Sequence, residues 1–226
     1  MKAIILAAGK GKRMRHLTQT VPKPLIKIGR KTVLEHLLDS LPTTVDEIII
    51  VIGYRGDQIR NFVGTTYKGK SVRYVVQRKL NGTAHAVLLA RDLFTDARER
   101  FFIIYGDELP TRREIRQCLA HTYSWLCHPL SHSIATGVVQ LDRNKRIIKI
   151  AEKRAGTRPP FISAGGVMLV SAHIFSYRPW RHKRTGEYYL TSMMSPFLRD
   201  HAVYAVIGRA DLYLSAPDDV DRTIRQ

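Results

Sequence analysis

A glycine-rich turn near the amino terminus could bind phosphate. Residues 6–14 read LAAGKGKRM, with glycines at positions 9 and 11 and basic side chains at Lys10, Lys12 and Arg13. Glycine lets a backbone turn tightly and approach a ligand closely, and exposed N–H groups with basic side chains hold anions. Neither the GxxxxGK[ST] nor the GxGxxG spacing is present, so the turn is not a Walker A loop or a dinucleotide fingerprint. A tight strand–helix turn with solvated lysines would show the same pattern, and both interpretations stay open.

A lysine enclosed by two prolines follows this turn. Pro22 and Pro24 restrict the backbone on either side of Lys23. A lysine held in this way is pre-positioned, although an ordinary surface loop could have the same composition.

Short apolar runs that alternate with helical stretches predict the elements that position these residues. The first half contains predicted strands at 3–8, 47–52, 72–77 and 101–105, and predicted helices at 33–38, 58–63 and 84–93. The second half contains a predicted hairpin at 134–141 and 146–151, a strand at 167–170, a helix at 188–198, a strand at 203–207 and a short helix from Pro217. Continuous apolar strands separated by helices indicate an α/β fold with a mixed, mostly parallel sheet. Ligands bind such sheets at the carboxyl ends of the strands.

Composition excludes several classes of protein. The chain has 226 residues, of which 44% are hydrophobic, and no apolar run approaches a membrane span. The apolar run 4–8 is too short for a signal peptide, so we expect a cytoplasmic protein with no membrane partner. Cys118 and Cys127 are expected as free thiols, and their spacing with His121, His128 and His132 matches no standard zinc site.

The formal charge of +18 is concentrated at the amino terminus. Residues 1–31 hold nine Lys or Arg and no Asp or Glu. A basic surface attracts polyanions, so the excess positive charge could serve to bind a triphosphate or nucleic acid. A generally basic proteome is a third explanation of this charge. The basic stretch 178–184 around Trp180 fits an exposed loop better than a nucleic-acid site.

The turn LAAGKGKRM with the following PKPL resembles the signature of the sugar-1-phosphate nucleotidyltransferases, or nucleoside-diphosphate-sugar pyrophosphorylases. Further matches follow in the family's order at Gln77 with residues 81–86 (NGTAHA), Gly106-Asp107, Glu152-Lys153, residues 163–166 (SAGG) and residues 187–191 (EYYLT). The resemblance implies one domain over 1–226, with a nucleotide-binding half (1–110) and an acceptor-binding half (111–226). It also implies the Rossmann-like fold of nucleotide-diphospho-sugar transferases and no attached acyltransferase domain.

By this resemblance, a phosphate oxygen of the acceptor attacks the α-phosphorus of a nucleoside triphosphate and releases pyrophosphate. Catalysis then consists mostly of positioning and charge neutralisation, with no protein nucleophile. The implied catalytic residues are Arg13, Lys23 and Asp107. Asp107 ends the predicted strand 101–105, where a carboxylate can hold Mg²⁺ against phosphate oxygens, although aspartate is also common in turns.

The resemblance also assigns binding residues. The nucleotide side comprises Leu6, Ala8, Gly9, Gly11, Arg13, Gln77, Gly82 and Thr83. The acceptor side comprises Lys23, Glu152, Ser163, Gly165 and Glu187. Gln77 and the run 82–86 are more similar to uridylyl and thymidylyl members than to guanylyl members. Ser163 stands where many members carry Asn, which puts the usual hexose in doubt.

One departure bears on activity. The family's second metal ligand, usually Asp, falls at Tyr213, and Asp211 lies on the same strand face and could replace it. The alternatives are therefore cytidylyl or guanylyl transfer to another acceptor, such as phosphocholine or mannose 1-phosphate, or a non-catalytic regulatory relative. Expected partners are a nucleoside triphosphate and a phosphorylated small molecule, with nucleic acid disfavoured and a homo-oligomer possible.

Overall fold

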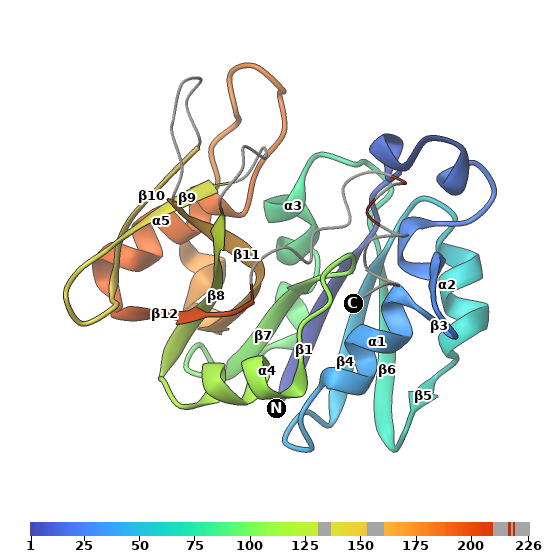
Figure 1. Cartoon of the computed structure of the whole chain (residues 1–226), viewed down its shortest axis with the longest axis horizontal. Helices are drawn as coiled ribbons and strands as arrows, with labels where there is room; N and C mark the ends of the chain where they lie inside the picture. Colours follow the sequence, from blue (N-terminus) through green and yellow to red (C-terminus); the bar gives the residue numbers. More distant parts are fainter. Residues whose placement is uncertain (131–136, 153–160, 210–216, 218, 220–226) are drawn as a thin grey trace.

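Four parallel strands form the centre of the molecule (Figure 1). The computed structural model describes residues 1–130, 137–152, 161–209, 217 and 219. β1 (Lys2–Ala7) lies between β4 (Glu47–Ile52) and β7 (Arg100–Tyr105), and β6 (Lys70–Val76) extends the parallel set beyond β4. The inner strands β1, β4 and β7 are almost continuously apolar because both of their faces are covered.

Antiparallel strands complete the sheet on the side of β7. The other strands are β2 (Lys27–Ile28), β3 (Lys31–Thr32), β5 (Thr66–Tyr67), β8 (Tyr123–Leu130), β9 (Gly137–Leu141), β10 (Ile147–Glu152), β11 (Phe161–Ser171) and β12 (Val203–Ile207). Within the described residues the strand order is β10-β9-β11-β7-β1-β4-β6-β5, with β8 joining β11 to β12. β11 is antiparallel to β7, β8 and β9, and its register against β8 shifts between Ala164 and Met168. The sheet is therefore mixed, as predicted.

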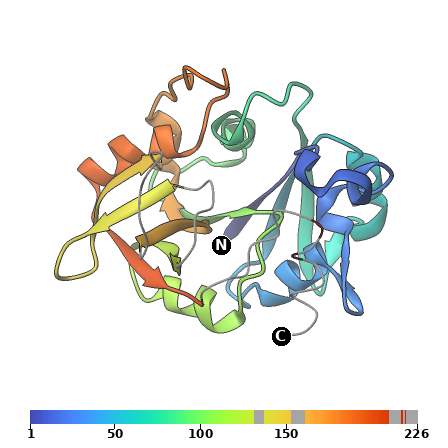
Figure 2. The ribbon, with the colours of Figure 1, turned by 45° about the horizontal axis from the view of Figure 1, so that its top comes forward.

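Helices cover both faces of this sheet. They are α1 (Val33–Ser40), α2 (Gly56–Val63), α3 (Thr83–Leu88), α4 (Arg112–Leu119) and α5 (Thr191–Asp200). α1, α2 and α4 pack in one core cluster with Ile5, whereas α3 and α5 pack in the other with Ile4. Figure 2 shows α3 and α5 on one side of the sheet and α1 and α4 on the other. Neighbouring residues of β1 serve opposite cores because side chains alternate along a strand.

Most predicted elements are present at or near their predicted bounds. Strands β4 and β12 begin and end where the apolar runs do. The predicted hairpin is confirmed where it is described, with β9 antiparallel to β10 and the Asp142 side chain accepting from the turn N–H groups of Asn144 and Arg146. The predicted helix 188–198 instead begins at Thr191, because the backbone of Tyr188 is hydrogen-bonded to the 81–84 segment.

The sequence analysis did not predict α4 or β8. α4 has a capping box in which the Thr111 hydroxyl accepts from Glu114 N–H and the Glu114 carboxylate accepts from Thr111 N–H. This T-x-x-E signal was available in the sequence and was missed. Cys118 and Cys127 are buried free thiols on these two elements, and the described residues contain no cluster of three potential metal ligands.

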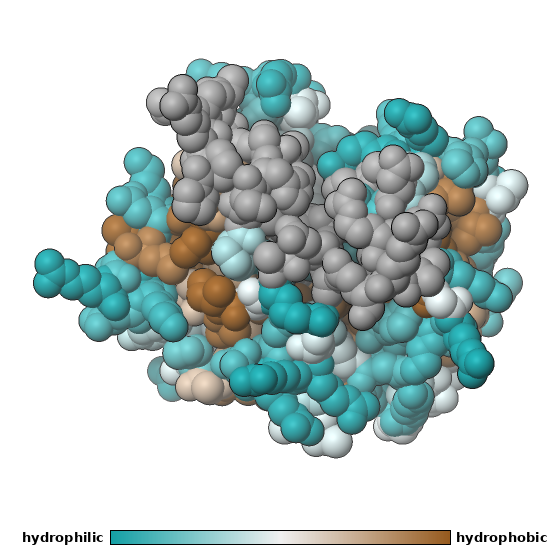
Figure 3. Space-filling model, in the orientation of Figure 1, coloured by the Kyte–Doolittle hydropathy of each residue, from teal (hydrophilic) through white to brown (hydrophobic). Residues whose placement is uncertain are grey.

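The face shown in Figure 3 is largely hydrophilic, with hydrophobic areas over the edge strands β10 and β12. Ile148 on β10 is 53% exposed and Ile207 on β12 is 39% exposed. Among the described helices, none combines the length and apolar character that a membrane span requires.

Candidate active site

A cavity of about 1210 Å³ opens at the carboxyl ends of the four parallel strands. The residues that follow these strands form its floor: Ala8 after β1, Gly53 after β4, Gln77 after β6 and Gly106 after β7. Gly53 and Gly106 allow adjacent strand ends to approach, because a Cβ at Gly53 would lie 2.8 Å from the Ala8 oxygen and one at Gly106 would lie 2.9 Å from the Leu6 oxygen. Five basic and two acidic residues line the cavity within the described chain.

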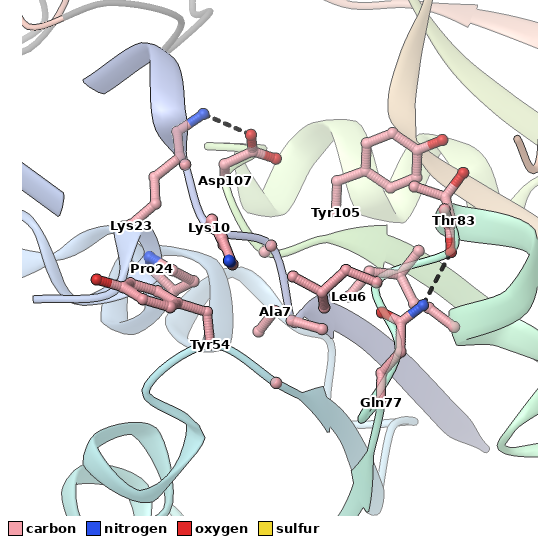
Figure 4. Close-up of a pocket in the computed structure, with 18 of the residues that line it drawn as sticks. Leu6, Ala7, Lys10, Lys23, Pro24, Tyr54, Gln77, Thr83, Tyr105 and Asp107 are labelled. Carbon is pink, nitrogen blue, oxygen red and sulfur yellow. Dashed lines mark hydrogen bonds and ion pairs between the residues drawn. The ribbon is translucent and has the colours of Figure 1, made fainter. Parts of the chain in front are cut away.

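Most of the predicted site residues meet at this cavity. Those that line it are Leu6, Ala8, Gly9, Gly11, Arg13, Lys23, Gln77, Gly82, Thr83, Asp107 and Glu187. These residues lie up to 181 positions apart in the sequence (6 to 187), and the fold brings them together at one cavity. Figure 4 shows Lys23 and Asp107 on one side of the cavity and Gln77 with Thr83 on another.

The two glycines of the glycine-rich turn differ in what their positions require. Gly11 has a φ of +61°, in the left-handed region that favours glycine. A Cβ at Gly9 would meet nothing within 4 Å, so that position is next to open space. A 3₁₀ turn over Lys12–Thr18 follows and presents Arg13 at the cavity. The Thr18 hydroxyl donates to the Gly11 carbonyl at 3.1 Å, which closes the loop on itself.

Side chains at the start of α2 hold the far end of this loop. Tyr54 Oη donates to the Thr18 carbonyl at 3.0 Å, Arg55 Nη2 donates to the Gln19 carbonyl at 2.6 Å, and Gln58 Nε2 donates to the Thr20 carbonyl at 3.0 Å. Three consecutive carbonyls are thereby satisfied from one helix end. The loop that carries Arg13 is therefore anchored to the scaffold.

Lys23 and Asp107 form an ion pair at the cavity. Lys23 Nζ lies 2.5 Å from Asp107 Oδ2, and the lysine side chain is only 10% exposed whereas the aspartate is 39% exposed. In Figure 4 the second carboxylate oxygen of Asp107 is turned away from Lys23. The pair places a positive and a negative group side by side on the cavity wall.

The neighbour of Asp107 is not among the residues that line the cavity. Glu108 is buried, and its Oε1 accepts the Gly166 N–H of β11 at 2.7 Å. Burial, and to a smaller extent the adjacent Asp107 carboxylate, raise the pKa of Glu108 to about 8. Glu108 therefore links the segment after β7 to β11.

Gln77 and Gly82 form the opposite end of the cavity. Gln77 is 4% exposed, and its Nε2 donates to the Gly82 carbonyl at 3.1 Å and lies 3.3 Å from His85 Nδ1. The amide is therefore oriented by the loop that it adjoins. Gly82 has a φ of +107°, and a Cβ there would overlap the backbone of Tyr188.

The predicted acceptor residues are only partly brought together. Glu187 is exposed at the cavity, but Ser163 and Gly165 are not on its wall. The Ser163 side chain is fully buried and donates to the His128 carbonyl at 3.1 Å, and the Gly165 carbonyl accepts Trp125 Nε1 at 2.6 Å. Both positions hold β11 against β8.

Three predicted positions cannot be placed at the site. Asp211 and Tyr213, the two candidates for the second metal position, lie outside the described residues. Glu152 ends β10, and its side chain is not described.

Several cavity residues were not predicted from the sequence. Tyr54, Arg78, Tyr105 and Tyr189 all line the wall. Tyr54 and Tyr105 could have been found from their places at the ends of predicted strands, and Tyr189 from its place in the 187–191 motif. Tyr189 also borders a smaller pocket of about 90 Å³ beside the exposed Trp180.

Sequence comparison places these features in a family. The model of the family described as nucleotidyl transferase matches residues 2–211. The bifunctional protein GlmU of Methanocaldococcus jannaschii is 33% identical over 165 residues, covering 73% of this chain and 39% of GlmU. The UTP–glucose-1-phosphate uridylyltransferase AglF of Haloferax volcanii is 34% identical over 110 residues, covering 48% of this chain and 44% of AglF. The chain spans about two fifths of the length of the GlmU relatives it matches.

Solved structures show the same fold. A Bacillus anthracis structure assigned as a glucose-1-phosphate thymidylyltransferase, in complex with a sucrose, has a TM-score of 0.85 at 24% identity and covers 100% of this chain and 94% of its own. A UDP-glucose pyrophosphorylase complexed with UDP-glucose has a TM-score of 0.82 at 18% identity and covers 99% of this chain and 97% of its own. With its motif residues gathered at one cavity and a family match over residues 2–211, this chain belongs to the nucleotidyl transferase family of enzymes.

Proposed function

We propose that this protein transfers a uridylyl or thymidylyl group from UTP or dTTP to a sugar 1-phosphate, releasing pyrophosphate and forming a nucleoside-diphosphate sugar. One observation carries the proposal. A single cavity joins a basic glycine-rich loop, the Lys23–Asp107 ion pair and the Gln77–Gly82 end, so that a triphosphate, the reacting phosphates and a base would each meet suitable groups.

The reaction requires two anions to approach within bonding distance. An oxygen of the acceptor phosphate forms a bond to the α-phosphorus, and the bond from that phosphorus to the bridging oxygen of the β-phosphate breaks. Repulsion between the two substrates is severe where water is scarce. Arg13 and the N–H groups at Gly9 and Gly11 would hold the triphosphate, and Lys23 would neutralise charge between the two phosphates.

Mg²⁺ fits the residues present. Asp107 offers a carboxylate that is 39% exposed at the cavity and contacts Lys23 through Oδ2. Mg²⁺ commonly binds through one or two protein carboxylates, with water and substrate phosphates completing its shell. A bound Mg²⁺ would supply further charge neutralisation at the phosphate oxygens. Asp211 is the proposed second carboxylate.

The preference for UTP or dTTP rests on the base end and on relatives. Gln77 presents an amide held by Gly82, and an amide can both donate to and accept from a pyrimidine edge. AglF is named as a UTP–glucose-1-phosphate uridylyltransferase, and one matched structure contains UDP-glucose. Glu187 and Tyr189 form the wall at which the sugar would bind.

A substrate matrix tests the proposal. Purified protein with Mg²⁺ is offered UTP, dTTP, CTP, GTP or ATP against glucose 1-phosphate, N-acetylglucosamine 1-phosphate, mannose 1-phosphate or phosphocholine, and pyrophosphate release is measured. We expect turnover with UTP or dTTP and a sugar 1-phosphate, and its loss on addition of EDTA. A clear preference for GTP would overturn the base assignment. Nucleotide binding without pyrophosphate release for any pair would favour the regulatory alternative.

A further inference from the structure

A second, smaller pocket lies beside the proposed acceptor end of the cavity. Its volume is about 90 Å³, against about 1210 Å³ for the main cavity, and Tyr189 lines both. Trp180 and His182, from the loop before α5 (orange in Figure 1), line the smaller pocket together with Ile150 of β10. One water needs roughly 10–15 Å³ of such space, so the pocket can hold a substituent of a few atoms but not a separate sugar.

The loop that carries His182 is held by its own hydrogen bonds. His182 N–H donates to the Glu187 carbonyl and Gly186 N–H donates to the His182 carbonyl, both at 2.8 Å. Arg181 Nε donates to the Gly186 carbonyl, also at 2.8 Å. The ring of His182 meets the ring of Tyr189 edge to face, with centroids 5.3 Å apart. These contacts fix the His182 ring at the smaller pocket, next to the acceptor end.

His182 can donate a hydrogen bond into this pocket. Thr185 N–H donates to His182 Nδ1 at 3.3 Å, so Nδ1 is an acceptor and the proton of the neutral ring is on Nε2. The hydroxyls of Ser192 and Ser195 also line the pocket, but they donate to backbone carbonyls at 2.6 and 3.0 Å. The Nε2–H group of His182 is therefore the side-chain donor best suited to a ligand there.

The surroundings of the smaller pocket are positively charged. Residues 178–184 contain four Arg or Lys and no Asp or Glu, and all four basic residues are exposed. No acidic residue is found among the described residues that line the pocket, and Glu187 lines the main cavity instead. Trp180 is 55% exposed, and its ring can pack against the apolar C–H face of a sugar. A donor, a positive field and an aromatic face together fit an anionic group carried by a sugar.

We propose that the smaller pocket is a specificity site for the acceptor, which binds a second anionic group at the end of the sugar away from the reacting phosphate. His182 Nε2–H donates to that group, a carboxylate or a phosphate, and the basic residues of the loop add favourable charge. The preferred acceptor is then a sugar 1-phosphate that is charged at both ends. The inference rests on the proposed function, because it takes the wall at Tyr189 as the acceptor end.

A comparison of three acceptors tests the proposal. Pyrophosphate release with UTP and Mg²⁺ is measured for glucose 1-phosphate, glucuronic acid 1-phosphate and glucose 1,6-bisphosphate. We expect kcat/KM to be about 10-fold higher or more for at least one of the two doubly charged acceptors, as for one charge-assisted hydrogen bond. The better of the two identifies the recognised group as a carboxylate or a phosphate.

Variants of His182 assign the preference to this pocket. His182→Phe keeps a ring against Tyr189 and removes the donor, so it should abolish the preference for a doubly charged acceptor. His182→Gln offers an N–H group again and should restore part of that preference. His121→Phe is the matched control, because His121 stacks on Tyr204 and lines neither pocket, and it should keep the wild-type preference.

Fluorescence of Trp180 gives a readout that does not need turnover. Of the two tryptophans in the chain, Trp125 is 2% exposed and Trp180 is 55% exposed, so acrylamide quenches mainly Trp180. An α,β-methylene analogue of UTP occupies the nucleotide end without reacting. The preferred doubly charged acceptor should then protect Trp180 from acrylamide in the wild type, at concentrations at which glucose 1-phosphate does not, and should fail to protect it in His182→Phe.

Three results would overturn the inference: a kcat/KM no higher for either doubly charged acceptor than for glucose 1-phosphate, a preference that survives His182→Phe, or quenching of Trp180 that no acceptor alters. Absence of pyrophosphate release with every pair of substrates would instead reject the proposed function. The quenching result would in that case still decide whether the pocket binds the second anionic group.

Discussion

Replacing Asp107 with Asn tests the centre of the proposed site. The change keeps the size of the side chain and an oxygen that can accept from Lys23, but it removes the negative charge. In the structure that charge faces Lys23 at 2.5 Å and is 39% exposed. We therefore expect the fold to persist, because Asp107 is partly exposed and asparagine still offers an oxygen to the buried Lys23.

The effect on catalysis should be much larger than the effect on stability. Two unit charges about 4 Å apart interact by roughly 4 kcal/mol at an effective dielectric constant of about 20. Partial exposure of Asp107 reduces this figure, so we take about 3 kcal/mol of transition-state stabilisation as lost. That corresponds to a fall in turnover on the order of 10²-fold or more.

Pyrophosphate release over a range of Mg²⁺ concentrations provides the assay. Asp107→Asn should lose activity and require more Mg²⁺ for half-maximal rate. Asp92→Asn, an exposed aspartate away from the cavity wall, is the control and should behave as the wild type. Asp211→Asn is the companion variant: a large loss would show that Asp211 serves as the second metal ligand, and no loss would show that water fills that position.

Two results would refute this reasoning. If Asp107→Asn kept a third or more of wild-type turnover at the same Mg²⁺ requirement, Asp107 would not hold the metal. If its thermal unfolding showed a large loss of stability, the fall in activity would report damage to the fold instead of loss of a ligand.

Three further predictions concern single residues. Arg13→Ala should weaken triphosphate binding in calorimetry without changing the melting temperature, and unchanged affinity would reject its role. Gly82→Ala should destabilise the fold by about 1–3 kcal/mol, because of its φ of +107° and the overlap with Tyr188, whereas Gly9→Ala should leave stability unchanged since its Cβ meets nothing within 4 Å. Glu108, with a pKa of about 8 against an ordinary 4.5, is protonated in the folded protein where the unfolded chain is ionised. The contribution of Glu108 to stability is therefore full below about pH 4.5 and is lost as pH rises through about 8, at about 1.4 kcal/mol per pKa unit. Glu108→Gln should remove this pH dependence of the free energy of unfolding, as measured by denaturant titrations at pH 5 and pH 8.

Much of the fold and part of the site could be predicted from local patterns. The apolar runs of β1, β4 and β7 are visible as strands because buried parallel strands are continuously hydrophobic. Asp107 was singled out by its place at the end of the predicted strand 101–105 and Gln77 by the family resemblance, and both line the cavity at the strand ends. α4 was not predicted, although Thr111 and Glu114 form a capping box. The local signal for this helix was present in the sequence and was overlooked.

Other features depend on contacts that no local pattern encodes. Ser163 matches a family position for the acceptor, yet β8 packs on β11 and directs its hydroxyl to the His128 carbonyl. Residues 188–190 have helical composition, but the hydrogen bonds of Tyr188 to the 81–84 segment keep them out of α5.

The sequence by itself determined the properties that arise within a few residues: the turn at Gly9 and Gly11, the restrained Lys23, and the alternation of strands and helices. These follow from backbone freedom, proline restriction and hydrophobic periodicity, which act along the chain. Only the tertiary structure decided which of these residues meet. The Lys23–Asp107 pair spans 84 positions and the Thr83–Leu190 bond spans 107. Such partners are selected by the order and direction of strands in the sheet, since the parallel strands bring their carboxyl ends to a common edge wherever they lie in the sequence.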